Sequence, residues 1–158
     1  MKEEFYSKSF EDTLKIADSF AKTLSKGDIV LLDGDLGAGK TVFSKGVVSA
    51  LSGGKITAVS PTFVIVNTYE TNPVVHHFDL YRISDESELD AIGAEEYFYS
   101  DAICLVEWPT RAEFMFPDSA IKVTINKISD DERKIVIERW CYEKSYYWLF
   151  CWYDNCCK

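Results

Sequence analysis

The 158-residue chain is long enough for one domain with a full hydrophobic core, and its 47% hydrophobic and 27% charged residues are typical of soluble globular proteins. No apolar run approaches the ~20 residues that a membrane span needs, and the charged N-terminus lacks the apolar region of a signal peptide, so we expect a cytoplasmic protein. The net charge of −9, with Lys and Arg scattered, argues against autonomous nucleic-acid binding and favours a protein partner.

The first predicted elements are a short edge strand over residues 5–8 and an amphipathic helix. Ser9 and Asp12 have the spacing of a capping box, which marks the start of the helix. Gly27 is expected to close the helix as its C-cap. Apolar residues recur between them at three- and four-residue steps: Phe10, Leu14, Ala17, Ala21 and Leu24.

The clearest motif is a phosphate-binding loop that fits G-x-x-x-x-G-K followed by Ser or Thr. An apolar run over 28–33 predicts a buried parallel strand before it, and the spacing over 41–51 predicts a helix after it. Strand, loop and helix together favour a P-loop NTPase over a chance glycine turn. The loop residues are Gly34, Asp35, Leu36, Gly37, Ala38, Gly39, Lys40 and Thr41.

This loop has the chemistry to bind ATP and Mg²⁺. Its glycines let successive backbone N–H groups approach phosphate oxygens, and the helix N-terminus adds partial positive charge. Lys40 is expected to reach the β- and γ-phosphates, and the Thr41 hydroxyl to ligate Mg²⁺.

Two strands, over 63–69 and 74–80, are predicted to form an antiparallel hairpin around the Asn72-Pro73 turn. Thr62 follows Pro61 in a loop that resembles a GTPase switch I, where a hydroxyl senses the γ-phosphate and Mg²⁺; the alternative is a turn threonine that bonds its own backbone.

Three titratable residues, His76, His77 and Asp79, lie on the second of these strands. Asp79 is costly to bury without a partner, so it either meets Mg²⁺ and orients water or pairs with Arg82. His76 and His77 alternate across the strand, so one faces inward, most simply as a structural histidine.

A helix over 84–92, ended by Gly93, and one more turn over 95–99 lead to an apolar strand over 102–107. This strand ends in Glu107, which is the Walker B pattern of an acid delivered beside the P-loop. Glu107 is predicted to bind Mg²⁺ or polarise water; the alternative is a solvent-facing carboxylate. Trp108 either shields the site, meets a partner or packs in the core.

Alternating apolar residues over 121–125 and 135–137 predict a second hairpin, joined by a turn at 129–132. Residues 126–129 approach the guanine motif N-K-x-D, but the acid comes one residue late, which favours ATP over GTP.

The composition changes at Trp140, where a tail rich in aromatic residues and cysteine begins. Residues 1–139 are expected to form the P-loop domain. Two interpretations of 140–158 stay open: an aromatic helix that docks on the sheet, and a non-native end such as a read-through product. Zinc binding is disfavoured, because no C-x-x-C pair joins Cys141, Cys151, Cys156 and Cys157.

The P-loop, the 60–63 segment S-P-T-F, the 77–82 segment H-F-D-L-Y-R and the 105–109 segment L-V-E-W-P together resemble the TsaE family, over roughly residues 9–139. The fold predicted from the motifs is α/β, a three-layer P-loop NTPase-like fold. Its central sheet is mixed, with antiparallel hairpin additions and flanking helices.

The resemblance implies an ATPase that supports the TsaB–TsaD complex in forming threonylcarbamoyladenosine at position 37 of tRNA. It implies that tRNA is held mainly by the partners, and that Lys40, Thr62, Asp79 and Glu107 are catalytic. Thr41, Asp79 and Glu107 are the expected metal ligands. Thr13 and Arg133 match positions where the family touches nucleotide. The competing hypotheses are a small-molecule or nucleotide kinase, which the isolated arginines disfavour, and a non-catalytic nucleotide-gated binding module.

Overall fold

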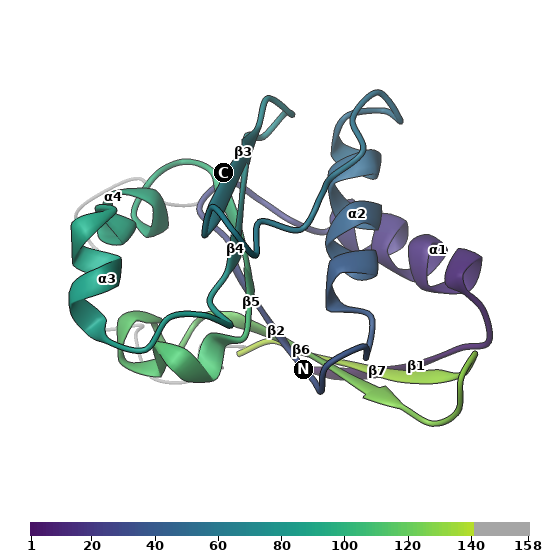
Figure 1. The fold of residues 1–158 in the computed structure, drawn as a ribbon. Coiled ribbons are helices and arrows are strands. Elements are labelled where there is room, and N and C mark those ends of the chain that lie inside the picture. The colour runs from purple at the N-terminus through teal and green to yellow at the C-terminus, as the bar shows by residue number, and fades with distance from the viewer. Residues whose placement is uncertain (141–158) are drawn as a thin grey trace, which may run out of the picture.

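The computed structural model describes residues 1–140, and its centre is a mixed sheet of seven strands (Figure 1). The strand order is β1-β7-β6-β2-β5-β4-β3. The four central strands β6, β2, β5 and β4 are parallel, and β1, β7 and β3 add antiparallel edges. The strands are β1 (Lys2–Ser7), β2 (Ile29–Asp33), β3 (Val66–Tyr69), β4 (Val75–Asp79), β5 (Ile103–Glu107), β6 (Ile121–Lys127) and β7 (Arg133–Glu138).

Helices cover both faces of this sheet. Figure 1 shows α1 (Phe10–Ala21) and α2 (Lys40–Leu51) on one side of the central strands and α3 (Glu86–Ala91) and α4 (Ala94–Phe98) on the other. Two short 3-10 helices, η1 (Pro109–Arg111) and η2 (Glu113–Met115), connect β5 to β6. The expected three-layer α/β fold with a mixed sheet and antiparallel additions is confirmed.

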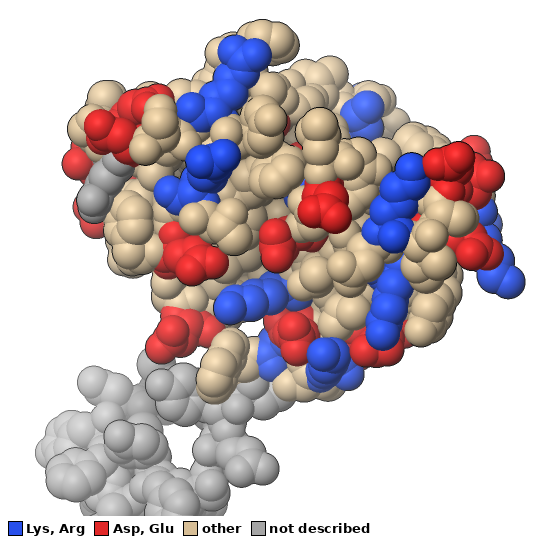
Figure 2. All heavy atoms as spheres, turned by 60° about the horizontal axis from the view of Figure 1, so that its bottom comes forward, with Lys and Arg blue, Asp and Glu red and all other residues tan. Residues whose placement is uncertain are grey.

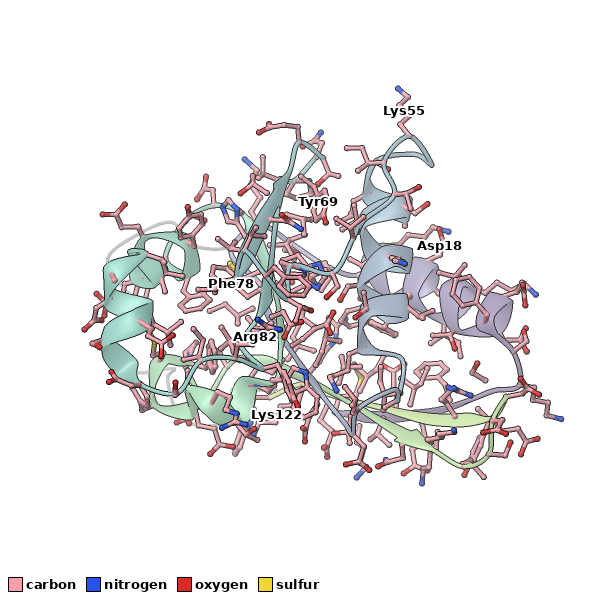
Figure 3. The ribbon with its side chains drawn as sticks, viewed as in Figure 1. Asp18, Lys55, Tyr69, Phe78, Arg82 and Lys122 are labelled. Atoms are coloured by element: carbon pink, nitrogen blue, oxygen red, sulfur yellow. The ribbon has the colours of Figure 1, made fainter. Side chains whose placement is uncertain are left out.

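The central strands are apolar on both faces because each face packs under helices. On β2, Val30 and Leu32 belong to the core beneath α1 and α2, whereas Ile29 and Leu31 belong to the core beneath α3 and α4. Phe78 on β4 lies in the second core, and its ring packs against Phe98 of α4 at 4.9 Å between centroids. Figure 3 shows Phe78 pointing to this side.

Most predicted elements are present, and three boundaries were wrong by three residues or more. β1 begins at Lys2 rather than residue 5, because it pairs with β7 from Lys2 onward. Ser9 caps α1 by accepting from the Asp12 backbone N–H at 3.1 Å. The helix ends at Ala21, however, so Gly27 is not its C-cap; it lies in the turn before β2 with φ +81°. β3 begins at Val66 rather than residue 63, because Ile65 takes φ +68°, which an extended strand does not allow.

None of the helices in residues 1–140 is long and apolar enough to cross a membrane. The aromatic tail and its four cysteines lie outside the described residues, apart from Trp140, which is exposed.

Candidate functional site

A cleft of about 360 Å³ opens where the carboxyl ends of the central strands meet the N-terminus of α2. This is the edge at which α/β proteins bind ligands. The residues that line it come from the P-loop, the 60–62 loop and the ends of β4 and β5: Leu36, Gly37, Gly39, Lys40, Thr41, Val42, Ser60, Thr62, Asp79, Tyr81, Glu107 and Trp108.

The glycines of the P-loop adopt positive φ angles, and Gly34 and Gly39 show what this provides. Gly34 has φ +145°, and a Cβ there would lie 2.4 Å from the Ile125 carbonyl oxygen. Gly39 is the N-cap of α2 with φ +114°, and no side chain caps the first amides of that helix. Uncapped amides at a helix N-terminus are suited to an anion, so the loop fits the phosphates expected from its sequence.

Lys40 is buried beside this loop. Its ammonium group donates to the carbonyl oxygen of Gly34 and, at 2.9 Å, to that of Asp35. It also lies 3.7 Å from the centre of the Trp108 ring, a cation–π contact. Burial lowers the pKa of Lys40, an effect that the nearby carboxylates, Glu107 foremost, oppose.

Asp79 and Glu107 come together because β4 and β5 are parallel and pair these two residues in register. Glu107 is 2% exposed, so it is not the solvent-facing carboxylate of the alternative interpretation. Thr41 Oγ1 donates to Glu107 Oε2 at 3.0 Å. Ser44 Oγ lies 3.3 Å from Oε1, and His77 Nε2 lies 2.8 Å from the same oxygen.

Asp79 is held by the 60–62 loop rather than by Arg82. Thr62 Oγ1 donates to Asp79 Oδ2 at 2.6 Å, and Ser60 Oγ lies 3.3 Å from that oxygen. The Tyr81 backbone N–H donates to Oδ1 at 3.1 Å. The alternative in which Thr62 bonds its own backbone is therefore not what this structure contains.

Two aromatic side chains, Tyr81 and Trp108, line the cleft. Trp108 packs against Tyr81, with 5.0 Å between ring centroids, so it lies at the site and not in the core alone. Arg82, labelled in Figure 3, stacks over the exposed ring of Phe63 with its guanidinium carbon 4.4 Å from the centroid.

Thr13 and Arg133 are not among the residues that line the cleft. Thr13 Oγ1 is buried, 2.7 Å from Ser7 Oγ, at the corner between β1 and α1. Arg133 Nε donates to the Ala38 carbonyl oxygen at 3.3 Å, so the β6–β7 hairpin contacts the P-loop through this hydrogen bond. Their contact with nucleotide stays a prediction.

The donor set fits Mg²⁺ only together with a phosphate ligand. Within residues 1–140, no group of three His, Cys, Asp or Glu is spaced to hold a metal ion. The Thr41 hydroxyl and the Glu107 and Asp79 carboxylates nevertheless present hard oxygen ligands at one edge of the cleft. Mg²⁺ commonly takes one or two protein ligands and completes its shell with water and substrate phosphates.

Two residues of this network were not found from the sequence. Ser44 lies one turn after Lys40 in α2, and His77 lies two residues before Asp79 on β4, so each shares a face with a predicted site residue. This spacing from Lys40 and from Asp79 was the feature of the sequence that could have indicated Ser44 and His77 as site residues. For His77, the alternation with His76 left open which of the two faces the site.

Both the sequence of this chain and its fold are similar to those of known proteins. Residues 7–135 match the family model described as "Threonylcarbamoyl adenosine biosynthesis protein TsaE". The TsaE protein of Bacillus subtilis is 41% identical over 126 residues, covering 79% of this chain and 78% of its own. The TsaE protein of Haemophilus influenzae is 38% identical over 128 residues, covering 77% and 80%. The crystal structure of Bacillus subtilis YdiB superposes with a TM-score of 0.73 at 34% identity, covering 88% of this chain and 86% of that one.

Proposed function

The chain belongs to the TsaE family, and on that premise we propose that it binds and hydrolyses ATP with Mg²⁺ in support of tRNA threonylcarbamoyladenosine biosynthesis. The observation that carries the proposal is the 3.0 Å hydrogen bond from Thr41 to Glu107, which joins the P-loop to the end of β5. A P-loop hydroxyl and a Walker B acid in contact are the pair that holds Mg²⁺ in P-loop NTPases.

Each group in the cleft has a task in this proposal. The uncapped amides of α2 and the Lys40 ammonium bind the phosphates and stabilise the charge that develops on them. Thr41 and Glu107 hold Mg²⁺, which when bound neutralises phosphate charge. Asp79 orients the attacking water, and Thr62, now bonded to Asp79, is positioned to respond to the γ-phosphate.

The proposed partners are the TsaB–TsaD pair, with tRNA reached through them. The net charge of −9 supports this indirect route, because polyanionic RNA is bound by concentrated positive charge. On the face drawn in Figure 2, Lys and Arg are interspersed with Asp and Glu rather than gathered in one basic patch. The partners would therefore supply most of the tRNA contacts.

The test is phosphate release from ATP by the purified chain, alone and with the TsaB–TsaD pair. We expect slow release alone, acceleration by the pair, and release at background in Lys40→Ala, which removes the charge that meets the phosphates. Lys45→Ala, on the same helix but away from the cleft lining, is the matched control and should behave as the parent.

Other outcomes separate the competing functions. If the TsaB–TsaD pair does not change the rate of phosphate release, the role in tRNA modification is contradicted. The chain would then be a generic P-loop ATPase. Transfer of the phosphoryl group to a small acceptor would identify a kinase. Normal release by Lys40→Ala would reject the site itself.

A further inference from the structure

A buried histidine holds the carboxylate of Glu107 at the oxygen that Thr41 does not contact. His77 Nε2 lies 2.8 Å from Glu107 Oε1, while the Thr41 hydroxyl meets Oε2 at 3.0 Å. The His77 ring is fully buried. A carboxylate oxygen can only accept, so the His77 Nε2–H donates.

His77 is the donor committed to Oε1. Ser44 Oγ lies 3.3 Å from Oε1 but also 3.2 Å from the Lys40 carbonyl oxygen, and its one hydrogen serves one acceptor at a time. Without His77, the only remaining donor near Glu107 Oε1 among the described residues would be the Ser44 hydroxyl, which also contacts the Lys40 carbonyl oxygen. The Glu107 carboxylate would then be free to change its orientation.

The sheet explains why His77 reaches Glu107 and not the cleft. His77 precedes Asp79 by two residues on β4, so both side chains leave the same face of the strand, and Asp79 pairs with Glu107 in register. Tyr69, labelled in Figure 3, lies on this side of the sheet with its ring centroid 6.5 Å from that of His77. The residues that line the cleft do not include His77.

Packing alone does not account for a histidine at this position. His77 Nδ1 is buried and has no hydrogen-bond partner in the described part of the chain. An unsatisfied buried polar atom is unfavourable for folding, so an apolar side chain of similar size would serve the core better. The neighbouring His76 faces the other side, where its Nδ1 lies 2.9 Å from Thr68 Oγ1.

We propose that His77 is a positioning residue: its Nε2–H fixes the Glu107 carboxylate so that Oε2 faces Thr41 and the metal position. This inference rests on the proposed function, because it takes Glu107 as part of the Mg²⁺ site. His77 acts through Glu107 and touches neither nucleotide nor metal.

The test uses four variants that place or remove a donor at known atoms of the ring. The amide nitrogen of His77→Gln stands near the place of Nε2, and that of His77→Asn near the place of Nδ1. His77→Leu removes both, and His76→Leu is the control on the opposite face. Calorimetry measures the Kd of a non-hydrolysable ATP analogue in EDTA and in saturating Mg²⁺, after circular dichroism has confirmed folding.

The informative quantity is the Mg²⁺ gain, which is the ratio of the two Kd values. We expect the parent, His76→Leu and His77→Gln to share one gain. In His77→Asn and His77→Leu the gain should fall about tenfold or more, the usual effect of losing a hydrogen bond to a metal ligand. Their Kd in EDTA should match that of the parent, because the P-loop contacts are unchanged.

An equal gain in the parent and His77→Asn would overturn the inference, and so would a His77→Gln gain no better than that of His77→Asn. Loss of affinity in EDTA as well as in Mg²⁺ would reveal a packing role and reject positioning. The Gln and Asn amides are matched in polarity, so their contrast decides the question even if His77→Leu does not fold. A parent that binds no nucleotide would instead reject the proposed function itself.

Discussion

The carboxylates of Glu107 and Asp79 are neighbours in the sheet but have different surroundings. Glu107 accepts from Thr41 on α2 and from His77 on β4, both rigid elements. Asp79 accepts from Thr62 on a loop whose next residue, Phe63, is 82% exposed. Fixed geometry suits a metal ligand, whereas a carboxylate tied to a loop suits a group whose partner changes when nucleotide binds. Replacing each carboxylate by its amide is therefore expected to change nucleotide binding and turnover differently for Glu107 and Asp79.

Glu107→Gln is expected to bind ATP in metal-free buffer as the parent does, because the phosphate contacts come from the P-loop. Turnover should fall about 100-fold or more, because the amide is a poorer ligand for Mg²⁺ and the charge stabilisation that the ion supplies is weakened. Phosphate release and calorimetry on the same preparation measure both quantities. Asp79→Asn is the comparison: normal turnover in Glu107→Gln with loss in Asp79→Asn would assign the essential role to Asp79.

The part of the site that follows strand ends could be predicted from the sequence. Parallel strands end at one edge of a sheet, so the P-loop after β2 and the acids that end β4 and β5 were expected at the same edge. Partners within the interior could not be predicted in the same way. The contact between His77 and Glu107 spans 30 residues and depends on strand register, which the alternation of His76 and His77 does not specify.

At the scale of elements, the position of the P-loop helix depends on how closely α2 approaches α1. Gly46 of α2 faces α1, and a Cβ added there would lie 2.5 Å from Ala17 Cβ and 3.2 Å from the Leu14 carbonyl oxygen. The backbones thus meet without an intervening side chain. Because α2 begins at Lys40, this contact also helps to set where the P-loop lies.

Gly46→Ala is expected to destabilise the protein by about 1–3 kcal/mol, the typical result of overpacking, although alanine favours the helix by about 1 kcal/mol in isolation. Urea unfolding followed by circular dichroism measures the change. Combining it with Ala17→Gly removes the opposing methyl group and should recover part of the loss. Equal or greater stability of Gly46→Ala alone would show that the helices have room to separate.

Two of the misplaced boundaries depend on single backbone torsions. Apolar and β-branched residues over 63–65 favoured a strand, but Ile65 has φ +68°, and the chain turns there before β3 begins. Gly27 has the positive φ of a C-cap, but it lies six residues after Ala21, the last residue of α1. Neither choice follows from hydrophobic periodicity, since both depend on where the chain must turn to enter the sheet.

At the scale of the whole molecule, the sheet separates two cores with different tasks. The core beneath α1 and α2 supports the P-loop and the two carboxylates. The core beneath α3 and α4 contains Cys104, a fully buried thiol on β5 whose Sγ lies 3.3 Å from the Tyr97 carbonyl oxygen. Because Cys104 lies on the face of β5 opposite Glu107, its ionisation reports on folding without involving the cleft.

Burial raises the pKa of the Cys104 thiol from 9.0 to about 12, so the folded chain keeps this proton at pH values where the unfolded chain releases it. The contribution of Cys104 to stability is therefore complete below pH 9 and is lost as the pH rises toward 12, at about 1.4 kcal/mol per pH unit. Cys104→Ala lacks this term, while every other titrating group is common to both chains. Urea unfolding in reductant, repeated from about pH 7 to about pH 10.5, should show a constant stability difference up to pH 9 that narrows above it. Parallel pH profiles would mean that the thiol ionises inside the folded core, against its burial beneath α3 and α4.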